Sequence, residues 1–230
     1  MMKINKELKK KKLEFFLAKL YHLVFSDKFK EKIKFNFNKG ISRLDLINFL
    51  IKKNHYQKYL EIGCDNDQVF SKIKISKIGV DPVSGGNFRG TSDDFFRENS
   101  ELFDCIFIDG LHEYSQVLRD IKNSIKILSL NGVILVHDCL PEKIYNQYVP
   151  RCTYKWNGDV WKAIVELRTY ENLNIQTILI DEGIAVIKKE KNKDVLKINQ
   201  RNFQNLKFEF FYHNYENLMK TIDYEKFIEQ

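Results

Sequence analysis

Acidic and histidine side chains follow four short apolar runs of this sequence, at the point where each run ends. YLEIG ends with Glu61 and Gly63, KIGVD with Asp81, FDCIFID with Asp109, and VILVHD with His137 and Asp138. If these runs are parallel strands, their carboxyl ends meet at one edge of a sheet, which is where ligands bind in open α/β folds. A lone acid after a strand is commonly a turn or capping residue. Four such ends together predict a ligand-binding crevice.

The loop after the first run limits the kind of nucleotide that could bind there. Glu61 and Asp81 are 20 residues apart, which suits an acid that accepts hydrogen bonds from ribose hydroxyls. A dinucleotide would need a glycine-rich turn for its pyrophosphate, but EIGCDND has one glycine and two aspartates. These carboxylates repel a pyrophosphate and favour a nucleoside that carries an ammonium and a sulfonium, as S-adenosylmethionine does.

The elements that would position these residues alternate between strands and helices from residue 40 onward. Strands are expected at 59–63, 77–81, 103–109 and 133–138, with a short one near Phe88 and a hairpin over 175–180 and 184–188. Helical periods fall between them. This order predicts an α/β fold with a Rossmann-like doubly wound sheet, mostly parallel, with a C-terminal antiparallel hairpin strand and helices on both faces.

Length and composition leave room for one main domain. The chain has 230 residues, of which 43% are hydrophobic, enough for one sizeable core. We expect a basic amphipathic N-terminal helical extension over 1–39, the main domain over 40–190, and a helical tail packed on it over 191–230. The four cysteines lack CxxC spacing, and no apolar run reaches the roughly 18 residues of a membrane span. A cytoplasmic location is the expectation.

Positive charge is concentrated in residues 1–39, which hold 12 lysines and four acidic residues. Helical spacing places five apolar residues on one face: Leu13, Phe16, Leu17, Leu20 and Val24. This face could pack on the main domain or on a second copy in a homodimer, which is the favoured interpretation. It could also lie on an anionic membrane surface or contact nucleic acid. The rest of the chain is close to neutral, so the composition gives nucleic acid little support.

Six segments, in order, resemble the class I S-adenosylmethionine-dependent methyltransferases: YLEIG, KIGVDP, GTSDDFF, FDCIFIDGLHEYSQVLRDI, NGVILVHDC and WNGDVWKAIVELR. The resemblance covers roughly residues 43–188 and is closest to the small stand-alone methyltransferases of bacterial surface-glycan biosynthesis. FIDGLHEY followed by VHDC is its most specific part. The family usually has more glycine in the first loop, where this chain has CDND.

The resemblance implies a role for each strand-end residue in binding S-adenosylmethionine. Glu61 and Gly63 would flank the cofactor, with Gly63 lacking the side chain that would collide with it. Asp81 would bind the ribose, Ser92 and Asp93 would approach the adenine, and Asp109 would lie near the methionine ammonium and the reacting methyl group. A hydroxyl becomes a good nucleophile only when its proton is removed, so His112, with Asp109, is the candidate general base.

The acceptor side is expected to include the loop of roughly 20 residues that follows Asp138. Trp156 and Trp161 could stack on a sugar ring, with His137 and Asp138 beside it. The resemblance therefore implies O-methylation of a sugar or polysaccharide precursor, a small-molecule or glycan acceptor. Some related enzymes bind a divalent cation at these strand ends, and Asp109 and Asp138 could supply oxygen ligands.

A metal is not the favoured interpretation, because Cys139 follows the second acid where an amide is usual. Two other functions stay open. One is a nicotinamide-dependent sugar-nucleotide enzyme on a similar fold, against which the missing glycine turn argues. The other is a nucleic-acid-binding protein that uses the basic N-terminus.

Overall fold

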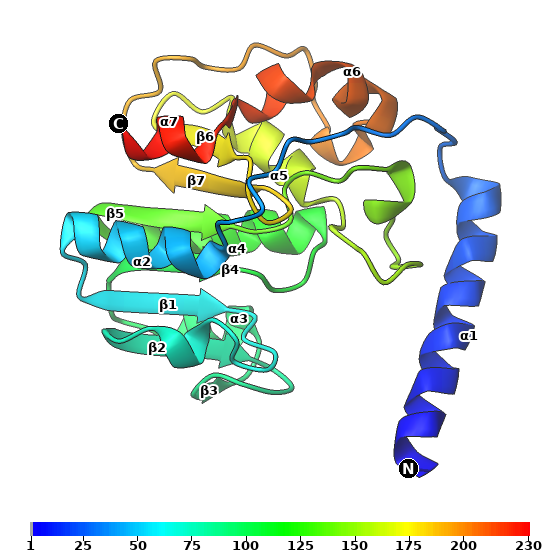
Figure 1. Cartoon of the computed structure of the whole chain (residues 1–230), viewed down its shortest axis with the longest axis horizontal. Helices are drawn as coiled ribbons and strands as arrows, with labels where there is room; N and C mark the ends of the chain where they lie inside the picture. Colours follow the sequence, from blue (N-terminus) through cyan, green and yellow to red (C-terminus); the bar gives the residue numbers. More distant parts are fainter. Residues whose placement is uncertain (1) are drawn as a thin grey trace.

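The computed structural model describes residues 2–230, with side chains described from Lys10 onward. One sheet of eight strands, in the order β3-β2-β1-β4-β5-β7-β6-β8, forms the centre of the molecule (Figure 1). The strands are β1 (Lys58–Ile62), β2 (Ser76–Asp81), β3 (Phe88–Arg89), β4 (Phe103–Ile108), β5 (Leu128–Val136), β6 (Asn174–Ile178), β7 (Ile184–Lys188) and β8 (Thr221–Ile222). Strands β1 to β5 pair in parallel, and β7 is antiparallel to both β5 and β6.

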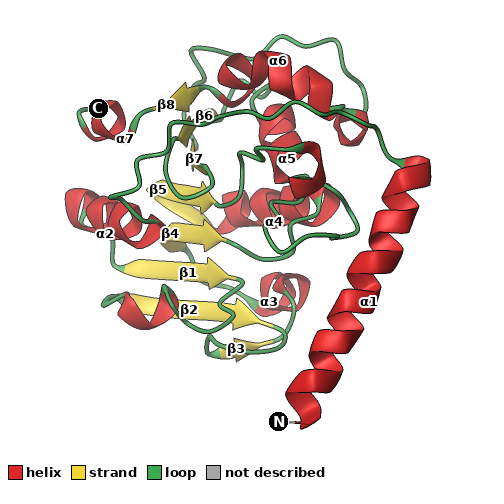
Figure 2. Cartoon of the chain, turned by 45° about the vertical axis from the view of Figure 1, so that its right-hand side comes forward, coloured by secondary structure: helices red, strands yellow, loops and turns green. Residues whose placement is uncertain are grey.

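Helices cover both faces of this sheet (Figure 2). These covering helices are α2 (Arg43–Asn54), α3 (Ser92–Glu98), α4 (Tyr114–Ile127), α5 (Val160–Leu167), α6 (Phe208–Met219) and α7 (Tyr224–Ile228), whereas α1 (Met2–Phe25) stands apart from the sheet. Helix α2 buries Leu46 and Ile47 on one face, beside Phe227 of α7. Helices α4 and α5 bury Ile121 and Ile164 on the other face. Apolar side chains on both sides of the central strands make them the best-protected part of the fold.

The chain places β2 and β3 on one side of β1, and β4 and β5 on the other. The order therefore reverses between β1 and β4, and in open α/β sheets ligands bind outside the carboxyl ends of the strands at such a point. The predicted Rossmann-like sheet with a C-terminal antiparallel hairpin is confirmed. Strand β8 is an addition: it pairs with β6 through Thr221 and Ile222, and two residues carry no period that a sequence pattern could show.

The N-terminal extension is less helical than predicted, and the main domain is excluded as one of the two predicted partners of its apolar face. Its helix ends at Phe25, and residues 26–42 form an irregular segment that crosses the body. There Ile33 donates its backbone N–H to the carbonyl of Glu142, and the ring of Phe29 packs against Tyr212 of α6. Also, the five residues expected on the apolar face are all exposed, so this face does not pack on the main domain. Among the described helices, none has the length and apolarity needed to cross a bilayer.

Candidate active site

Gly63 lets the ends of β1 and β4 approach each other closely. Its φ is +87°, and a Cβ atom there would lie 2.3 Å from the carbonyl oxygen of Asp109. Only glycine tolerates this combination. A side chain at this position would therefore collide with the neighbouring strand end, whereas the family resemblance implies a collision with a bound cofactor.

Asp81 connects the two loops that follow β1 and β2. One carboxylate oxygen accepts the backbone N–H groups of Cys64 and Asp65, at 3.2 and 3.0 Å, and the other accepts those of Val83 and Ser84, both at 2.8 Å. Burial opposes ionisation, but these four bonds hold the pKa of Asp81 below its ordinary value. The carboxylate therefore stays charged and orders the floor of the crevice.

A cavity of about 630 Å³ opens beside Asp81 and is also lined by Ser92, Asp93 and Asp109. Ser92 donates its hydroxyl to the carboxylate of Asp120 on α4, at 2.7 Å. Burial raises the pKa of Asp120 to about 6. Asp93 lies at the rim, where Arg119 donates to it at 2.9 Å. The two residues predicted to approach an adenine therefore line the same cavity as the predicted ribose-binding acid.

A second cavity of about 440 Å³ shares Gly63, Asp65 and Asp109 with the first and extends to Glu61 and Arg43. The side chain of Glu61 is buried and accepts the hydroxyl of Tyr59 at 2.6 Å. Burial raises the pKa of Glu61 to about 7. This space thus contains acids that can bind an ammonium group and a guanidinium that can bind a carboxylate.

Asp109 is the centre of a cluster of charges at the end of β4. Its carboxylate accepts from Nη1 of Arg43 at 2.5 Å and lies 3.2 Å from ring nitrogens of both His112 and His137. Arg43 also donates to Asp181, in the turn between β6 and β7, at 2.7 Å. Although Asp109 is largely buried, the charges and hydrogen bonds of the two histidines hold its pKa well below the ordinary value.

His112 lies between two carboxylates, because Nε2 faces Asp109 and Nδ1 lies 3.2 Å from Oδ2 of Asp138. Burial alone would lower the pKa of His112, but these two carboxylates raise it above the ordinary value. Asp138 in turn accepts the side-chain amide of Asn157 at 2.8 Å. The predicted base is therefore protonated more readily than an ordinary histidine.

The loop that follows β5 is pressed directly onto His112. The ring of Trp156 stacks on the imidazole with centroids 5.3 Å apart, and its indole N–H donates to the carbonyl of Tyr148. Gly158 has a φ of +61°, and a Cβ atom there would lie 1.7 Å from the carbonyl oxygen of His112. This glycine allows the loop to cover the histidine.

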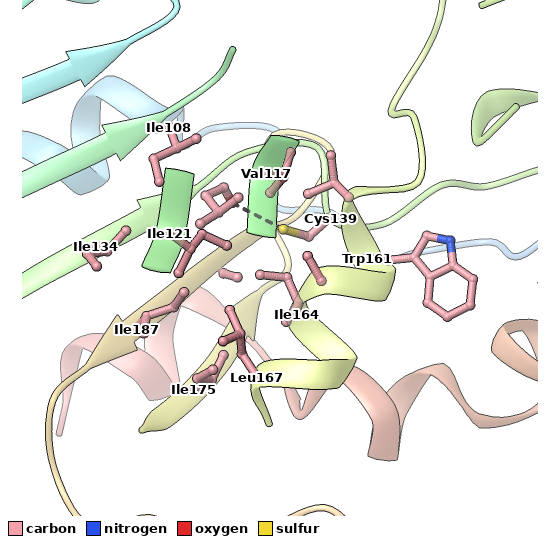
Figure 3. Close-up of a cluster of buried hydrophobic side chains, with 14 of the residues drawn as sticks. Ile108, Val117, Ile121, Ile134, Cys139, Trp161, Ile164, Leu167, Ile175 and Ile187 are labelled. Carbon is pink, nitrogen blue, oxygen red and sulfur yellow. Dashed lines mark hydrogen bonds between the residues drawn. The ribbon is translucent and has the colours of Figure 1, made fainter. Parts of the chain in front are cut away.

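Trp161 lies elsewhere. It projects from α5 (Figure 3) and is completely buried. Its ring centroid is 4.6 Å from that of Phe211. Its indole N–H donates to the side chain of Gln147 at 2.6 Å. A fully buried ring offers no face to a sugar, so Trp161 is not part of the acceptor site in this structure.

Asp109, His137 and Asp138 offer ligand atoms that lie within 4.8 Å of one another, so this donor set could hold a divalent cation. His137 is buried, and although burial opposes its charge, the two carboxylates raise its pKa well above the ordinary value. The two carboxylates therefore favour the protonated form of His137. The thiol of Cys139, which follows Asp138, donates a hydrogen bond to the carbonyl oxygen of Val136.

The sequence model of a family described as a methyltransferase domain matches residues 18–139, which is more than half of the chain. The chain belongs to this methyltransferase family. The match begins within α1 and ends just after Asp138, so it includes every strand end that lines the two cavities. No curated protein shows significant sequence similarity to the chain.

Solved structures with a similar fold are distant in sequence. A methyltransferase from Podospora anserina, solved with S-adenosylhomocysteine, aligns with a TM-score of 0.51 at 16% identity, over 79% of this chain and 88% of its own. A putative O-methyltransferase from Klebsiella pneumoniae aligns with a TM-score of 0.52 at 10% identity, over 65% of this chain and 81% of its own. A putative caffeoyl-CoA O-methyltransferase from Staphylococcus aureus aligns with a TM-score of 0.50 at 15% identity, over 82% of this chain and 100% of its own. These similarities support the methyltransferase fold.

Several residues of this methyltransferase site give no signal in the sequence. Arg43 reaches Asp109 from the start of α2, and Asp181 pairs with Arg43 from a hairpin turn. Charged residues at such places are usually solvated. Asp120 and Gln116 lie on α4 among surface-like residues, yet both contact Ser92. Only the topology of the sheet brings these residues together.

Proposed function

We propose that this methyltransferase transfers a methyl group from S-adenosylmethionine to a hydroxyl oxygen of a sugar or surface-polysaccharide precursor. The observation that carries the proposal is the pair of joined cavities at the ends of β1, β2 and β4, which share Asp65 and Asp109. Their carboxylates suit a cationic nucleoside and oppose a pyrophosphate. S-adenosylmethionine supplies an electrophilic methyl group when bound.

In this proposal each cavity binds one end of the cofactor. Asp81 accepts from the ribose hydroxyls, while Ser92 and Asp93 contact the adenine. Glu61 and Asp109 bind the methionine ammonium in the smaller cavity. Arg43, which is absent from the sequence prediction, suits the methionine carboxylate because its guanidinium lines the same cavity.

A third cavity, of about 470 Å³ and with a mostly polar lining, supports the proposed acceptor site. It includes Tyr114, Gln147, Tyr148, Lys162, Gln204 and Asn205. Amide, phenol and ammonium groups of this kind donate to and accept from sugar hydroxyls. The cavity also includes Asp159, whose backbone N–H donates to the carbonyl of His112. We therefore propose that a sugar binds between this cavity and Trp156, near Asp138 and His137.

We propose His112 as the general base for the acceptor hydroxyl. It lies three residues beyond Asp109 and contacts both Asp109 and Asp138. A base must be unprotonated, and the same carboxylates that raise the pKa of His112 would stabilise it once it holds the proton from the hydroxyl. A divalent cation on Asp109 and Asp138 is the less favoured way to activate that hydroxyl.

We place the enzyme in the cytoplasm, at the inner face of the membrane. The four cysteines are free and buried, as expected of a protein in a reducing compartment. The lysine-rich N-terminal segment suits a surface that carries negative charge.

Titration calorimetry with S-adenosylhomocysteine tests the cofactor directly. We expect micromolar binding, no binding of NADH, and at least a tenfold loss of affinity in Asp81→Ala, equivalent to about 1.4 kcal/mol. Because Asp81 also orders two loops, thermal unfolding of the variant must be measured in parallel. Absence of S-adenosylhomocysteine binding to the folded wild-type protein would contradict the proposal, whereas binding of NADH would favour a nicotinamide enzyme.

We expect cofactor binding to release protons from Glu61. With a pKa of about 7, it is half protonated at pH 7, and a bound ammonium nearby would favour the carboxylate, so about half a proton should leave. Calorimetry in buffers of different ionisation enthalpy measures this number. It should fall to near zero in Glu61→Gln and stay unchanged in Glu101→Gln, an exposed control. Equal proton release by wild type and Glu61→Gln would assign the proton to another group.

A further inference from the structure

Helix α1 presents a broad apolar face that nothing in the described chain covers. Each of its six residues is between 45% and 72% exposed: Leu13, Phe16, Leu17, Leu20, Leu23 and Val24. At 100° per residue they occupy one side of the helix. Both cartoon views show α1 standing apart from the sheet and its covering helices (Figures 1 and 2). An exposed apolar surface of this extent marks a site of interaction.

The opposite side of α1 is fixed to the loop that covers the candidate active site. The ring of His22 stacks on Tyr148 with centroids 4.1 Å apart, and its Nε2 lies 2.7 Å from the carbonyl oxygen of Pro150. Phe15 packs edge-on against Tyr154 at 5.2 Å. Tyr148 also accepts the indole N–H of Trp156, which stacks on His112. The helix is therefore connected to the proposed base through a single loop.

The charge of α1 favours a partner with negative charge. The helix contains seven lysines and two glutamates, and five further lysines follow it before residue 40. Lys10, Lys12 and Lys19 are exposed beside the apolar residues. A second copy of the chain would bring two such lysine-rich helices together, at a cost in repulsion. An anionic lipid surface instead takes up both the apolar side chains and the lysines.

We propose that α1 binds the surface of an anionic lipid bilayer, with its apolar face in the interfacial layer and its lysines at the lipid phosphates. Docking of this kind holds the loop from Tyr148 to Trp156 about one helix diameter, roughly 10 Å, from the bilayer, because the loop contacts the opposite side of the same helix. Where the proposed function holds, the acceptor is then a sugar carried on a membrane lipid, which reaches the site without leaving the surface.

Vesicle sedimentation of the full-length protein tests the docking without any acceptor. We expect binding to vesicles of phosphatidylcholine with about a third phosphatidylglycerol, and little binding to phosphatidylcholine alone. Leu20→Glu should weaken binding of the protein to the anionic vesicles at least tenfold. Leu130→Glu is the matched control, since Leu130 is 89% exposed in β5 and distant in sequence from α1. Replacing Lys10, Lys11 and Lys12 by glutamine should weaken binding most at low salt.

Calorimetry with S-adenosylhomocysteine separates this proposal from the proposed function. Leu20→Glu should bind the nucleoside as the wild type does, which shows that the variant is folded. Equal binding of Leu20→Glu and wild type to anionic vesicles would overturn the docking, as would no binding by either. A dimer in solution that Leu20→Glu dissociates, without vesicle binding, would assign the face to a second copy.

Discussion

Asp109→Asn is expected to lower S-adenosylhomocysteine affinity at least tenfold and the free energy of unfolding by about 3 kcal/mol. The carboxylate lines both proposed cofactor cavities, and it pairs with Arg43 and with two histidines. An asparagine keeps the shape but removes the negative charge. The buried His137 then has one carboxylate fewer beside it, and its protonated form depends on that negative charge. Loss of one partner from a buried charge cluster costs much more than loss of an exposed ion pair.

Urea unfolding and titration calorimetry on the same preparations measure both effects. Asp104→Asn is the matched control, because Asp104 lies on β4, the strand that Asp109 follows, and accepts the backbone N–H groups of Gln57 and Lys58 near the start of β1. It should lose stability while binding S-adenosylhomocysteine as the wild type does. An Asp109→Asn protein with wild-type stability and affinity would show that the cluster contributes to neither.

The sequence predicts the fold well because the fold depends on patterns that local residues determine. Apolar runs such as FDCIFID become buried strands, and the helix that buries Val117 and Ile121 follows its helical period. The end of β2 is equally local: Asp81 follows Val80 directly, so its place at the sheet edge follows from the strand itself. Chemistry that is attached to strand ends can therefore be predicted from the order of residues alone.

Features that depend on tertiary packing cannot be predicted in this way. The spacing of Trp161 fits a binding surface and a core equally well, and only the contact with Phe211 of α6 assigns it to the core. Asn157 reaches Asp138 from 19 residues away. The apolar face of α1 is a further case. An apolar stripe on a helix predicts that the stripe is buried, but it does not identify the surface that covers it. No side chain from Lys10 onward covers that face.

His112→Ala is expected to slow methyl transfer by about a hundredfold to ten-thousandfold, the usual contribution of a general base. S-adenosylhomocysteine binding should change little, since neither of the two proposed cofactor cavities is lined by His112. Transfer of a labelled methyl group to the best acceptor from a panel of nucleotide-linked and lipid-linked sugars measures the rate. His213→Gln, at an exposed histidine of α6, is the control for loss of an imidazole.

The pH dependence distinguishes a base from a residue that only supports the loop. Activity should rise with pH as His112 loses its proton, and the midpoint should lie above the ordinary histidine pKa because Asp109 and Asp138 raise the pKa of His112. Added imidazole should partly restore His112→Ala by replacing the missing base. If a chelator abolishes transfer while His112→Ala retains the wild-type rate, a cation on Asp109 and Asp138 activates the hydroxyl instead. In that case the histidine serves to hold Trp156 and the loop in place.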